Sequence, residues 1–306
     1  MRDESKGMLL GLLAVTGFGF TLPVTRMVVA ELDPMFIGFG RALVAALVAA
    51  VWLIATNSRL PNASQWRRLL ITMSCVAVGF PLLSAWAMQS VPASHGGVVL
   101  AVVPLGTALV GAFIARERPS TGFWMVSLAG SVIVAAYSIR GGSETLQTGD
   151  LALLGAVITA VIGYAMGGQL SRELGGAATI CWTLVLSLPF VAVPTWLAAP
   201  TSFSAVSTGS WIGFLYLALV SQLFGFFLWN AGLALGGIAR VSQTQLVQPF
   251  VTIVASVWLL GETIEPLTIG FAVVVISLVA MSRNMPIYSV SPLAATTPAT
   301  CRTKGD

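Results

Sequence analysis

VPLGTALVGAFIARE at residues 103–117 and QPFVTIVASVWLLGE at residues 248–262 share one pattern. Three residue types recur in it at a single offset of 145 residues: Pro104 and Pro249, Thr107 and Thr252, Glu117 and Glu262. GFGF at 17–20 and VIGY at 161–164 repeat at nearly the same offset. Several matches separated by nearly the same number of residues predict that the chain contains an internal duplication.

The composition is that of a membrane protein. Of the 306 residues, 57% are hydrophobic and 8% are charged, whereas soluble domains carry about 25% charged residues. Several stretches of about 18 or more residues have no charge, and each is long enough to cross ~30 Å of hydrocarbon as a helix. The alternation typical of a β-barrel is absent. We therefore expect an all-α integral membrane protein.

Charges and turn residues divide the chain into ten predicted transmembrane helices. Their ranges are 8–30, 35–55, 68–90, 94–115, 121–139, 150–170, 177–199, 210–233, 239–260 and 267–283. With the offset above, they form one five-helix repeat in residues 1–143 and a second in 144–285. Because five is odd, the two repeats insert in opposite directions, which is the inverted-repeat architecture of many transporters. The tail at 286–306 is rich in Pro, Ser and Thr, and we expect it to be disordered.

The Lys and Arg residues indicate the orientation. If both termini are cytoplasmic, twelve of these residues lie inside and three lie at the outer side. The outer three are Arg26, Arg41 and Arg140. This bias follows the positive-inside rule and predicts cytoplasmic termini in a plasma membrane. The net charge of +4 is scattered between spans, so it does not indicate a nucleic-acid partner.

Motifs of enzymes and cofactor sites are missing. No GxSxG, HExxH or Walker A sequence occurs, so the sequence supports neither a hydrolase nor transport driven by nucleotide hydrolysis. Cys75, Cys181 and Cys301 have no CxxC spacing, which leaves metal, disulfide and redox sites without support. We expect no enzyme activity, no metal and no cofactor.

The paired Pro-to-Glu segments and the paired five-helix halves resemble the drug/metabolite transporter (DMT) superfamily, in its ten-helix EamA-like branch. The resemblance covers the chain up to about residue 283. Within that branch the chain is most similar to the YddG-type exporters of aromatic and other neutral amino acids. The resemblance implies a basket of helices around a central cavity. It is lined mainly by the first, third, fourth, sixth, eighth and ninth spans, with the fifth and tenth at the periphery.

Ionisable residues are scarce inside the predicted spans. Asp, Glu and Lys are expected only near span ends, and the ionisable residues near the hydrocarbon are Arg41 and His95. Proton and organic-cation antiporters usually need an intramembrane carboxylate, so their mechanism is disfavoured. His95 is expected near the outer interface, either solvated or in a gating or proton-linked role. Arg41 could anchor a carboxylate, but the favoured interpretation is that it snorkels to the outer headgroups.

Polar residues form a stripe on the ninth predicted span. Gln245, Gln248, Thr252 and Ser256 follow helical spacing and share one face. Their counterparts in the first half are Leu100, Val103, Thr107 and Gly111, so most of the stripe exists in one half only. One interpretation is bonding between helices; the other, which we favour, is that Gln245, Gln248 and Thr252 line a wet substrate cavity.

Aromatic residues and helix breakers complete the candidate site. Trp86, Tyr164 and Trp182 lie within spans and are candidate substrate contacts, although packing against lipid or helices is the alternative. Candidate hinge or gating residues are Gly17, Gly19, Pro23, Gly163, Gly167, Pro104 and Pro249. Close helix packing is the alternative for the glycines.

These features together predict a secondary transporter of a bacterial inner membrane. We expect it to export small neutral or zwitterionic metabolites, including aromatic amino acids, by alternating access. Two rivals remain: an exporter of lipophilic drugs, and a structural or sensory membrane protein with no transported substrate. The expected partners are the small-molecule substrate and the lipid bilayer, and both a monomer and a homo-oligomer fit the sequence.

Overall fold

The computed structural model describes residues 2–114, 117–122, parts of 125–136, 148–283 and 287–289. The first half contains α1 Arg2–Gly19, α2 Thr21–Val28, α3 Pro34–Ala55, α4 Ala63–Thr72, the π-helix η1 Met73–Gly79, α5 Phe80–Ala87, α6 Ala93–Leu100, α7 Val103–Ile114 and strand β1 Glu117–Pro119. Most of the predicted fifth span (121–139), the predicted repeat boundary at 143 and most of the tail lie outside the described residues.

The second half repeats this order of elements. It contains α9 Thr148–Leu174, α10 Gly176–Leu197, the 3₁₀ turn η2 Phe203–Ala205, α11 Thr208–Leu215, the π-helix η3 Tyr216–Phe224, α12 Gly225–Gly236, α13 Ile238–Val241, the 3₁₀ segment η4 Ser242–Val247, α14 Gln248–Leu260, α15 Pro266–Arg283 and strand β2 Ile287–Ser289. The two short strands pair antiparallel.

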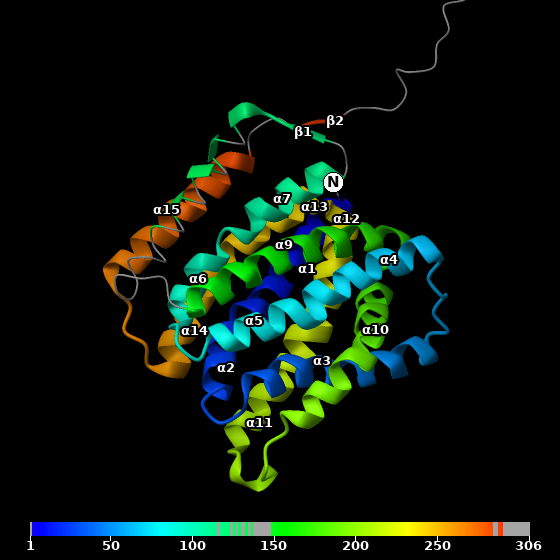
Figure 1. Ribbon diagram of the computed structural model, residues 1–306. Helices are drawn as coiled ribbons and strands as arrows, with labels where there is room; N and C mark the ends of the chain where they lie inside the picture. Colours follow the sequence, from blue (N-terminus) through cyan, green and yellow to red (C-terminus); the bar gives the residue numbers. More distant parts are fainter. Residues whose placement is uncertain are drawn as a thin grey trace, which may run out of the picture.

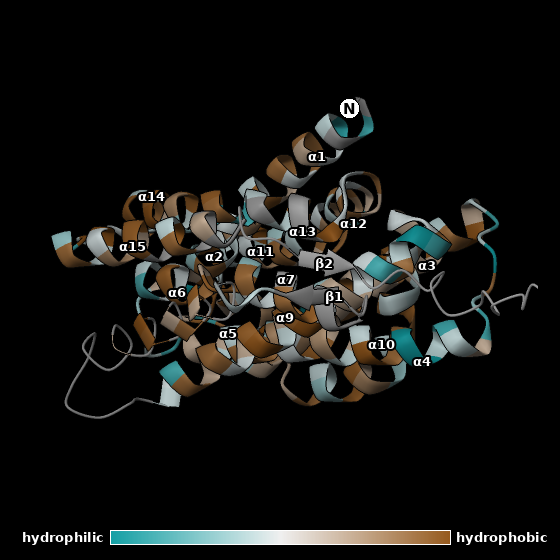
Figure 2. Cartoon of the chain, turned by 90° about the horizontal axis from the view of Figure 1, so that it is seen from above, coloured by the Kyte–Doolittle hydropathy of each residue, from teal (hydrophilic) through white to brown (hydrophobic). Residues whose placement is uncertain are grey.

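The helices have the length and composition needed to cross a membrane. In the described part of the chain, seven helices reach membrane length and two shorter apolar helices cover 244–260 and 266–278. Figure 2 shows hydrophilic residues at helix ends, such as the starts of α1 and α4, and hydrophobic residues along the helix sides. The prediction of an all-α membrane fold is confirmed.

The two halves interlock rather than lie side by side. α3 packs against α10, α1 packs against α12, and α6 packs against α14. α9 likewise packs against α4, η1 and α5. Each half therefore places its first span against the third span of the other half, and the second and fourth spans meet their own counterparts. In Figure 1, α15 lies at the margin of this bundle.

Irregularities in the helices recur at the sequence offset. The π-helix η1 ends at Gly79 and η3 ends at Phe224, which is 145 residues later. α7 begins at Val103 and α14 begins at Gln248, again 145 residues apart. The duplication seen in the sequence thus appears as matched interruptions of the third and fourth spans of each half.

The prolines explain the breaks in the fourth and ninth spans. Pro104 and Pro249 lack an N–H, so the carbonyls four residues earlier, Leu100 and Gln245, cannot accept the usual helix bond. At the ninth span the backbone forms a hydrogen bond over three residues instead of four: the Gln248 N–H donates to the Gln245 carbonyl. At the fourth span, α6 ends at Leu100. The predicted ninth helix is consequently three pieces: α13, η4 and α14.

The first span is broken by the same chemistry, but only in one half. Pro23 cannot donate to the Gly19 carbonyl, and α1 ends at Gly19 before α2 begins at Thr21. The equivalent position 145 residues later is Gly168, and α9 runs unbroken from Thr148 to Leu174. The two halves therefore share an architecture but differ at the middle of their first spans.

Candidate functional site

An aromatic cluster occupies the interior between the first, sixth and eighth spans. The Phe18 ring lies 6.4 Å from Tyr164 and 5.1 Å from Phe226, and the Tyr164 ring lies 5.5 Å from Trp229. Tyr164 is 7% exposed and Trp229 is fully buried. Tyr164 was a candidate substrate contact from the sequence, whereas Phe18, Phe226 and Trp229 were not among the candidate site residues.

Arg41 lies in the same interior and is 1% exposed. Its Nη2 donates to Gln222 Oε1 at 2.7 Å and to Ser221 Oγ at 3.3 Å. Gln222 Nε2 in turn donates to the Val76 carbonyl of η1 at 3.0 Å, and the Ser221 and Thr21 hydroxyls are 2.8 Å apart. The guanidinium is thus held by side chains of the eighth span, and these contact both the third span and the first.

The favoured interpretation of Arg41 was wrong. A snorkelling arginine keeps its charged end in the headgroup region, whereas Arg41 points into the bundle and has no exposed end. The sequence placed it seven residues into α3, close enough to the outer interface for snorkelling. The direction of the side chain depends on tertiary packing and could not be read from that position.

His95 is buried and paired, contrary to the expectation of a solvated interfacial residue. Its Nε2 lies 3.0 Å from Asp150 Oδ1, and the two residues are each 6% exposed. Asp150 stands in the first turn of α9, within the membrane-length helix Thr148–Leu174. The expectation that Arg41 and His95 are the ionisable residues near the hydrocarbon therefore missed Asp150, because a span-end aspartate in TGDLALL gives no sign of its burial.

The polar stripe of the ninth span is divided by the 3₁₀ segment. Gln245 belongs to η4, is 2% exposed, and its Oε1 has no hydrogen-bond partner among the described residues. Gln248 is half-buried at the start of α14. Thr252 Oγ1 donates to the Gly19 carbonyl at 2.8 Å, and Ser256 Oγ donates to the Thr252 carbonyl. The stripe thus contains one unpaired amide oxygen and hydroxyls that bond the protein itself.

Thr252 supplies the bond that Pro23 removes. Its hydroxyl reaches the carbonyl that Pro23 leaves without a helix donor, from the opposite half of the protein. In the same interruption, the Tyr216 hydroxyl donates to the Gly17 carbonyl at 2.6 Å. Buried carbonyls in a membrane protein need such partners because no water replaces the helix bond. The broken first span is therefore held by side chains of the eighth and ninth spans.

The two candidate tryptophans, Trp86 and Trp182, make no ring contact with this aromatic cluster, although Trp182 packs against the larger core that contains it. Trp86 is 58% exposed, on the side of α5 opposite the buried Ser84. Trp182 is half-buried in α10, with its ring 5.5 Å from Trp66, and its Nε1 has no partner among the described residues. The structure does not bring either ring into contact with Tyr164.

The candidate hinge residues fall into two groups. Gly17, Gly19 and Pro23 flank the break between α1 and α2, and Pro104 and Pro249 stand at the starts of α7 and α14. Gly163 and Gly167 lie within the unbroken α9, where a methyl group added to Gly163 would meet Val76 of η1. A hinge role stays a prediction for all seven residues.

Glu262, the last residue of the second repeat motif, caps a helix of the first half. Its carboxylate accepts from the Ala93 and Ser94 N–H groups at 2.9 and 3.1 Å, and from Ser94 Oγ at 2.7 Å. Arg26 Nε lies 3.9 Å from the same carboxylate. A carboxylate is favoured at a helix N-terminus, so Glu262 ties the end of the ninth span to the start of the fourth.

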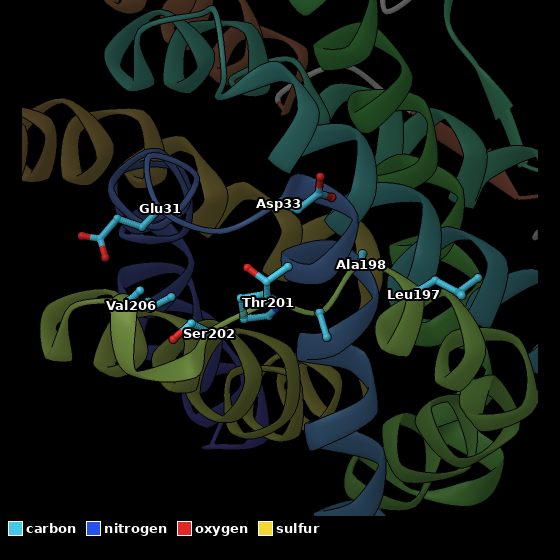
Figure 3. A pocket seen from close by; sticks show the side chains of 10 residues that line it. Glu31, Asp33, Leu197, Ala198, Thr201, Ser202 and Val206 are labelled. Carbon is cyan, nitrogen blue, oxygen red and sulfur yellow. The ribbon is translucent and has the colours of Figure 1, made fainter.

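A surface hollow of about 630 Å³ lies between the α2–α3 loop and the loop after α10. Figure 3 shows Glu31 and Asp33 from the first loop, with Thr201 and Ser202 from the second. Both carboxylates already accept hydrogen bonds from the protein itself. Asp33 caps α3 by accepting from the Met35 N–H, and Glu31 accepts from the Ser207 N–H and Oγ. The Ser207 bonds lower the pKa of Glu31. This hollow is a loop junction and a weaker candidate than the interior.

No cluster of three or more His, Cys, Asp or Glu side chains that could hold a metal occurs within the described ranges. The interior therefore offers aromatic rings, amides, hydroxyls and one guanidinium to a ligand.

Relatives of the chain are bacterial transporters. It is 36% identical over 284 residues to the "Uncharacterized transporter YdeK" of Bacillus subtilis, covering 93% of this chain and 99% of the relative. It is 25% identical to a "Probable terminal-alkyne amino-acid exporter" of Streptantibioticus cattleyicolor, over 92% and 94% of the two chains. It is 23% identical to a "Probable amino-acid metabolite efflux pump" of Salmonella typhimurium, over 88% and 91%.

Fold and family comparisons agree with the duplicated architecture. A solved crystal structure superimposes with a TM-score of 0.65 at 17% identity, covering 92% of this chain and 97% of that one. The model of the EamA-like transporter family matches twice, at residues 5–139 and 147–283. This chain is therefore a multi-pass membrane transporter that belongs to the EamA-like transporter family, within the drug/metabolite transporter superfamily.

Proposed function

We propose that this transporter exports small neutral or zwitterionic amino acids, including aromatic ones, across a bacterial inner membrane by alternating access. The observations that carry the proposal are a buried aromatic cluster around Tyr164 and a buried amide oxygen of Gln245 without a partner among the described residues. Gln245 belongs to η4, which packs against α1, the helix that carries Phe18 of the aromatic cluster. Two relatives with amino-acid exporters in their names support the same substrate class.

The proposed site is made by two groups of residues. Gln245 and Gln248 supply amides, because a buried amide oxygen without a partner is costly and a substrate ammonium would satisfy it. Tyr164, with Phe18, Phe226 and Trp229, supplies an apolar aromatic wall for a substrate side chain. Thr252 has a supporting role, since it holds the Gly19 carbonyl.

The proposed orientation has both termini in the cytoplasm. In Figure 1 the N-terminus and the β1–β2 pair lie at one end of the bundle, and the loop between α10 and α11 lies at the other. Arg67 and Arg68 of α4, and Arg172 in the last turn of α9, belong to the helix ends expected at the cytoplasmic side. In this arrangement residues 1–143 and 144–285 are the two inverted repeats.

Flux into vesicles tests the proposal. The purified chain in proteoliposomes should exchange radiolabelled L-phenylalanine for unlabelled amino acid, and other neutral amino acids should compete. Vesicles without protein provide the baseline, and vesicles with the Tyr164→Ala variant should show reduced exchange. Wild-type vesicles that exchange none of the twenty amino acids would contradict the proposal.

The same vesicles separate the rival functions. An exporter of lipophilic drugs would move a hydrophobic dye, and amino acids would not displace it. A structural or sensory protein would show no solute-specific flux for either probe. The charged, hydrogen-bonding interior around Arg41 favours a polar substrate over a lipophilic one.

A further inference from the structure

Arg41 has a buried charge that no acidic side chain in the described part of the chain neutralises. Among the described residues, ion pairs join Arg26 to Glu262, Arg68 to Glu173 and His95 to Asp150, and none reaches Arg41. The titratable groups that interact with Arg41 are Tyr164 and Tyr216, and a tyrosine with its ordinary pKa near 10 is neutral at physiological pH. Charged side chains inside a membrane protein are normally paired, so a missing anion is implied.

The unused donors of Arg41 are on two of its three guanidinium nitrogens. Nε and Nη1 are buried and have no hydrogen-bond partner, whereas Nη2 serves Gln222 and Ser221. An arginine has five N–H donors, one on Nε and two on each terminal nitrogen. The free donors are thus the one of Nε and the two of Nη1, which lie on different edges of the guanidinium and leave up to three hydrogen bonds open to an anion.

The surrounding network holds the guanidinium in place without neutralising it. Gln222 is oriented by its bond to the Val76 carbonyl, which leaves its Oε1 directed at Arg41. Ser221 is shared with Thr21. Both partners of Arg41, Gln222 and Ser221, are neutral, so they fix the position of the positive charge but do not neutralise it. Arg68 differs: two of its nitrogens donate to the Glu173 carboxylate at 2.6 and 2.7 Å.

We propose that Arg41 binds the carboxylate of the transported amino acid, with Gln222 and Ser221 as positioning residues. This inference rests on the proposed function and names the group that anchors the substrate. A carboxylate suits the site because it accepts hydrogen bonds from a guanidinium with the best geometry and strength. Gln222, which bonds Arg41, also bonds the Val76 carbonyl, and Val76 packs against Gly163, the neighbour of Tyr164 in the chain. A substrate anchored at Arg41 would therefore have the aromatic cluster around Tyr164 nearby for an apolar side chain.

Two ligands that differ only at the carboxylate test the proposal on the unaltered protein. L-phenylalanine should raise the melting temperature in detergent and compete for exchange of radiolabelled L-phenylalanine. L-phenylalanine methyl ester, which keeps the ammonium and ring but has no carboxylate, should compete about ten- to a hundredfold more weakly. Equal competition by acid and ester would overturn the proposal, whether or not any variant folds.

Variants then assign the effect to Arg41. Arg41→Gln should raise the half-saturating concentration of L-phenylalanine by about ten- to a hundredfold, and Arg41→Lys should restore part of the affinity because it keeps the charge. The ester should bind wild type and Arg41→Gln equally. Arg68→Gln, which removes an arginine already paired with Glu173, is the matched control and should leave the half-saturating concentration unchanged.

The outcomes separate this inference from the proposed function. Wild-type protein without amino-acid exchange contradicts the function. Wild-type exchange with the same half-saturating concentration in Arg41→Gln contradicts the role of Arg41 and leaves the function intact. If Arg41→Gln does not fold, the acid and ester comparison on wild type decides the question.

Discussion

At the scale of single residues, hydrogen-bond satisfaction separates structural polar groups from candidate binding groups. Thr252 and Gln245 were predicted to share one face of a cavity. The Thr252 hydroxyl is committed to the Gly19 carbonyl, whereas the Gln245 amide oxygen is buried without a partner. A buried polar group without a hydrogen bond destabilises the fold, whereas a hydrogen-bonded one stabilises it. The two residues should therefore respond differently to substitution.

We predict that Thr252→Val lowers stability and that Gln245→Leu lowers affinity. Valine leaves the Gly19 carbonyl without a donor, since Pro23 has no N–H, and should cost about 1 kcal/mol of unfolding free energy. Leucine at 245 should leave stability nearly unchanged and weaken amino-acid binding by roughly 5- to 30-fold. Melting temperature in detergent and half-saturating substrate concentration, measured on both variants, check the prediction. Ser256→Ala is the control, because its hydroxyl bonds within its own helix. A Gln245→Leu variant that melts early but binds normally would return this residue to a structural role.

The buried pair of His95 and Asp150 leads to a prediction about coupling. Asparagine at 150 keeps a hydrogen-bonding partner for the histidine but removes a titratable carboxylate. We expect Asp150→Asn to retain exchange of amino acids in vesicles without a pH gradient, and to flatten the pH dependence of net transport. Arg26 and Glu262 are the charged groups at the start of the same helix, α6, and both remain in this variant. A variant with the wild-type pH profile would show that the pair is structural.

Much of the residue-scale site was beyond sequence reasoning for a physical reason. Tyr164 and Gln245 were chosen as candidates because an aromatic or amide inside an apolar span is itself a signal, and their role in binding stays a prediction. Gln222 carries the same signal in the eighth span and was overlooked. The burial of Arg41 and the pairing of His95 with Asp150 depend on which helices meet, and no local pattern encodes that. The direction of a side chain near a span end is set by its neighbours.

At the scale of elements, the helices in the described part of the chain lie where spans were expected, but their interruptions were not all foreseen. Hydropathy locates a span because about twenty consecutive residues must be mainly apolar for a helix to cross the hydrocarbon core. The breaks come from single prolines, and each removes one carbonyl partner: Pro23 for Gly19, Pro104 for Leu100 and Pro249 for Gln245. The helical wheel used for the ninth span failed across η4, because a 3₁₀ segment advances side chains by a different angle from an α-helix.

We predict that Pro23→Ala joins α1 and α2 into one helix and slows transport. Alanine can donate to the Gly19 carbonyl and removes the ring that crowds it, so melting temperature should rise. If the break permits movement between the halves, the exchange rate should fall while substrate affinity changes little. Pro189→Ala is the matched control: it restores an N–H inside α10, which is already continuous. A slower exchange in both variants would indicate general rigidity, and unchanged exchange in Pro23→Ala would remove the hinge interpretation.

At the scale of the whole molecule, the duplication accounts for how the halves fit together. Each first span packs on the third span of the other half, and the fourth and ninth spans pack together, joined by Glu262 at the start of α6. Such reciprocal contacts fit two copies of one five-helix unit, and the odd number of spans in each copy predicts that the two insert in opposite directions. In an inverted repeat the orientations of the two halves are linked: if one half inserted the other way round in the membrane, the other half would as well.

We therefore predict that residue 60 faces the cytoplasm and residue 201 faces the exterior. Both are exposed loop positions, Leu60 in the loop before α4 and Thr201 in the loop after α10. The native Cys75, Cys181 and Cys301 are first replaced by serine or alanine, and a single cysteine is introduced at position 60 or 201. A membrane-impermeant maleimide added to intact cells should label Thr201→Cys and not Leu60→Cys, and it should label both after permeabilisation. The charge distribution supplies the reason, since Arg59, Arg67 and Arg68 flank residue 60 while 198–207 carries no Lys or Arg. If Leu60→Cys alone is labelled in intact cells, the orientation is the reverse of the predicted one and both termini lie outside. Labelling of both positions would instead break the symmetry argument, because the odd number of spans in each repeat requires these two loops to lie on opposite sides.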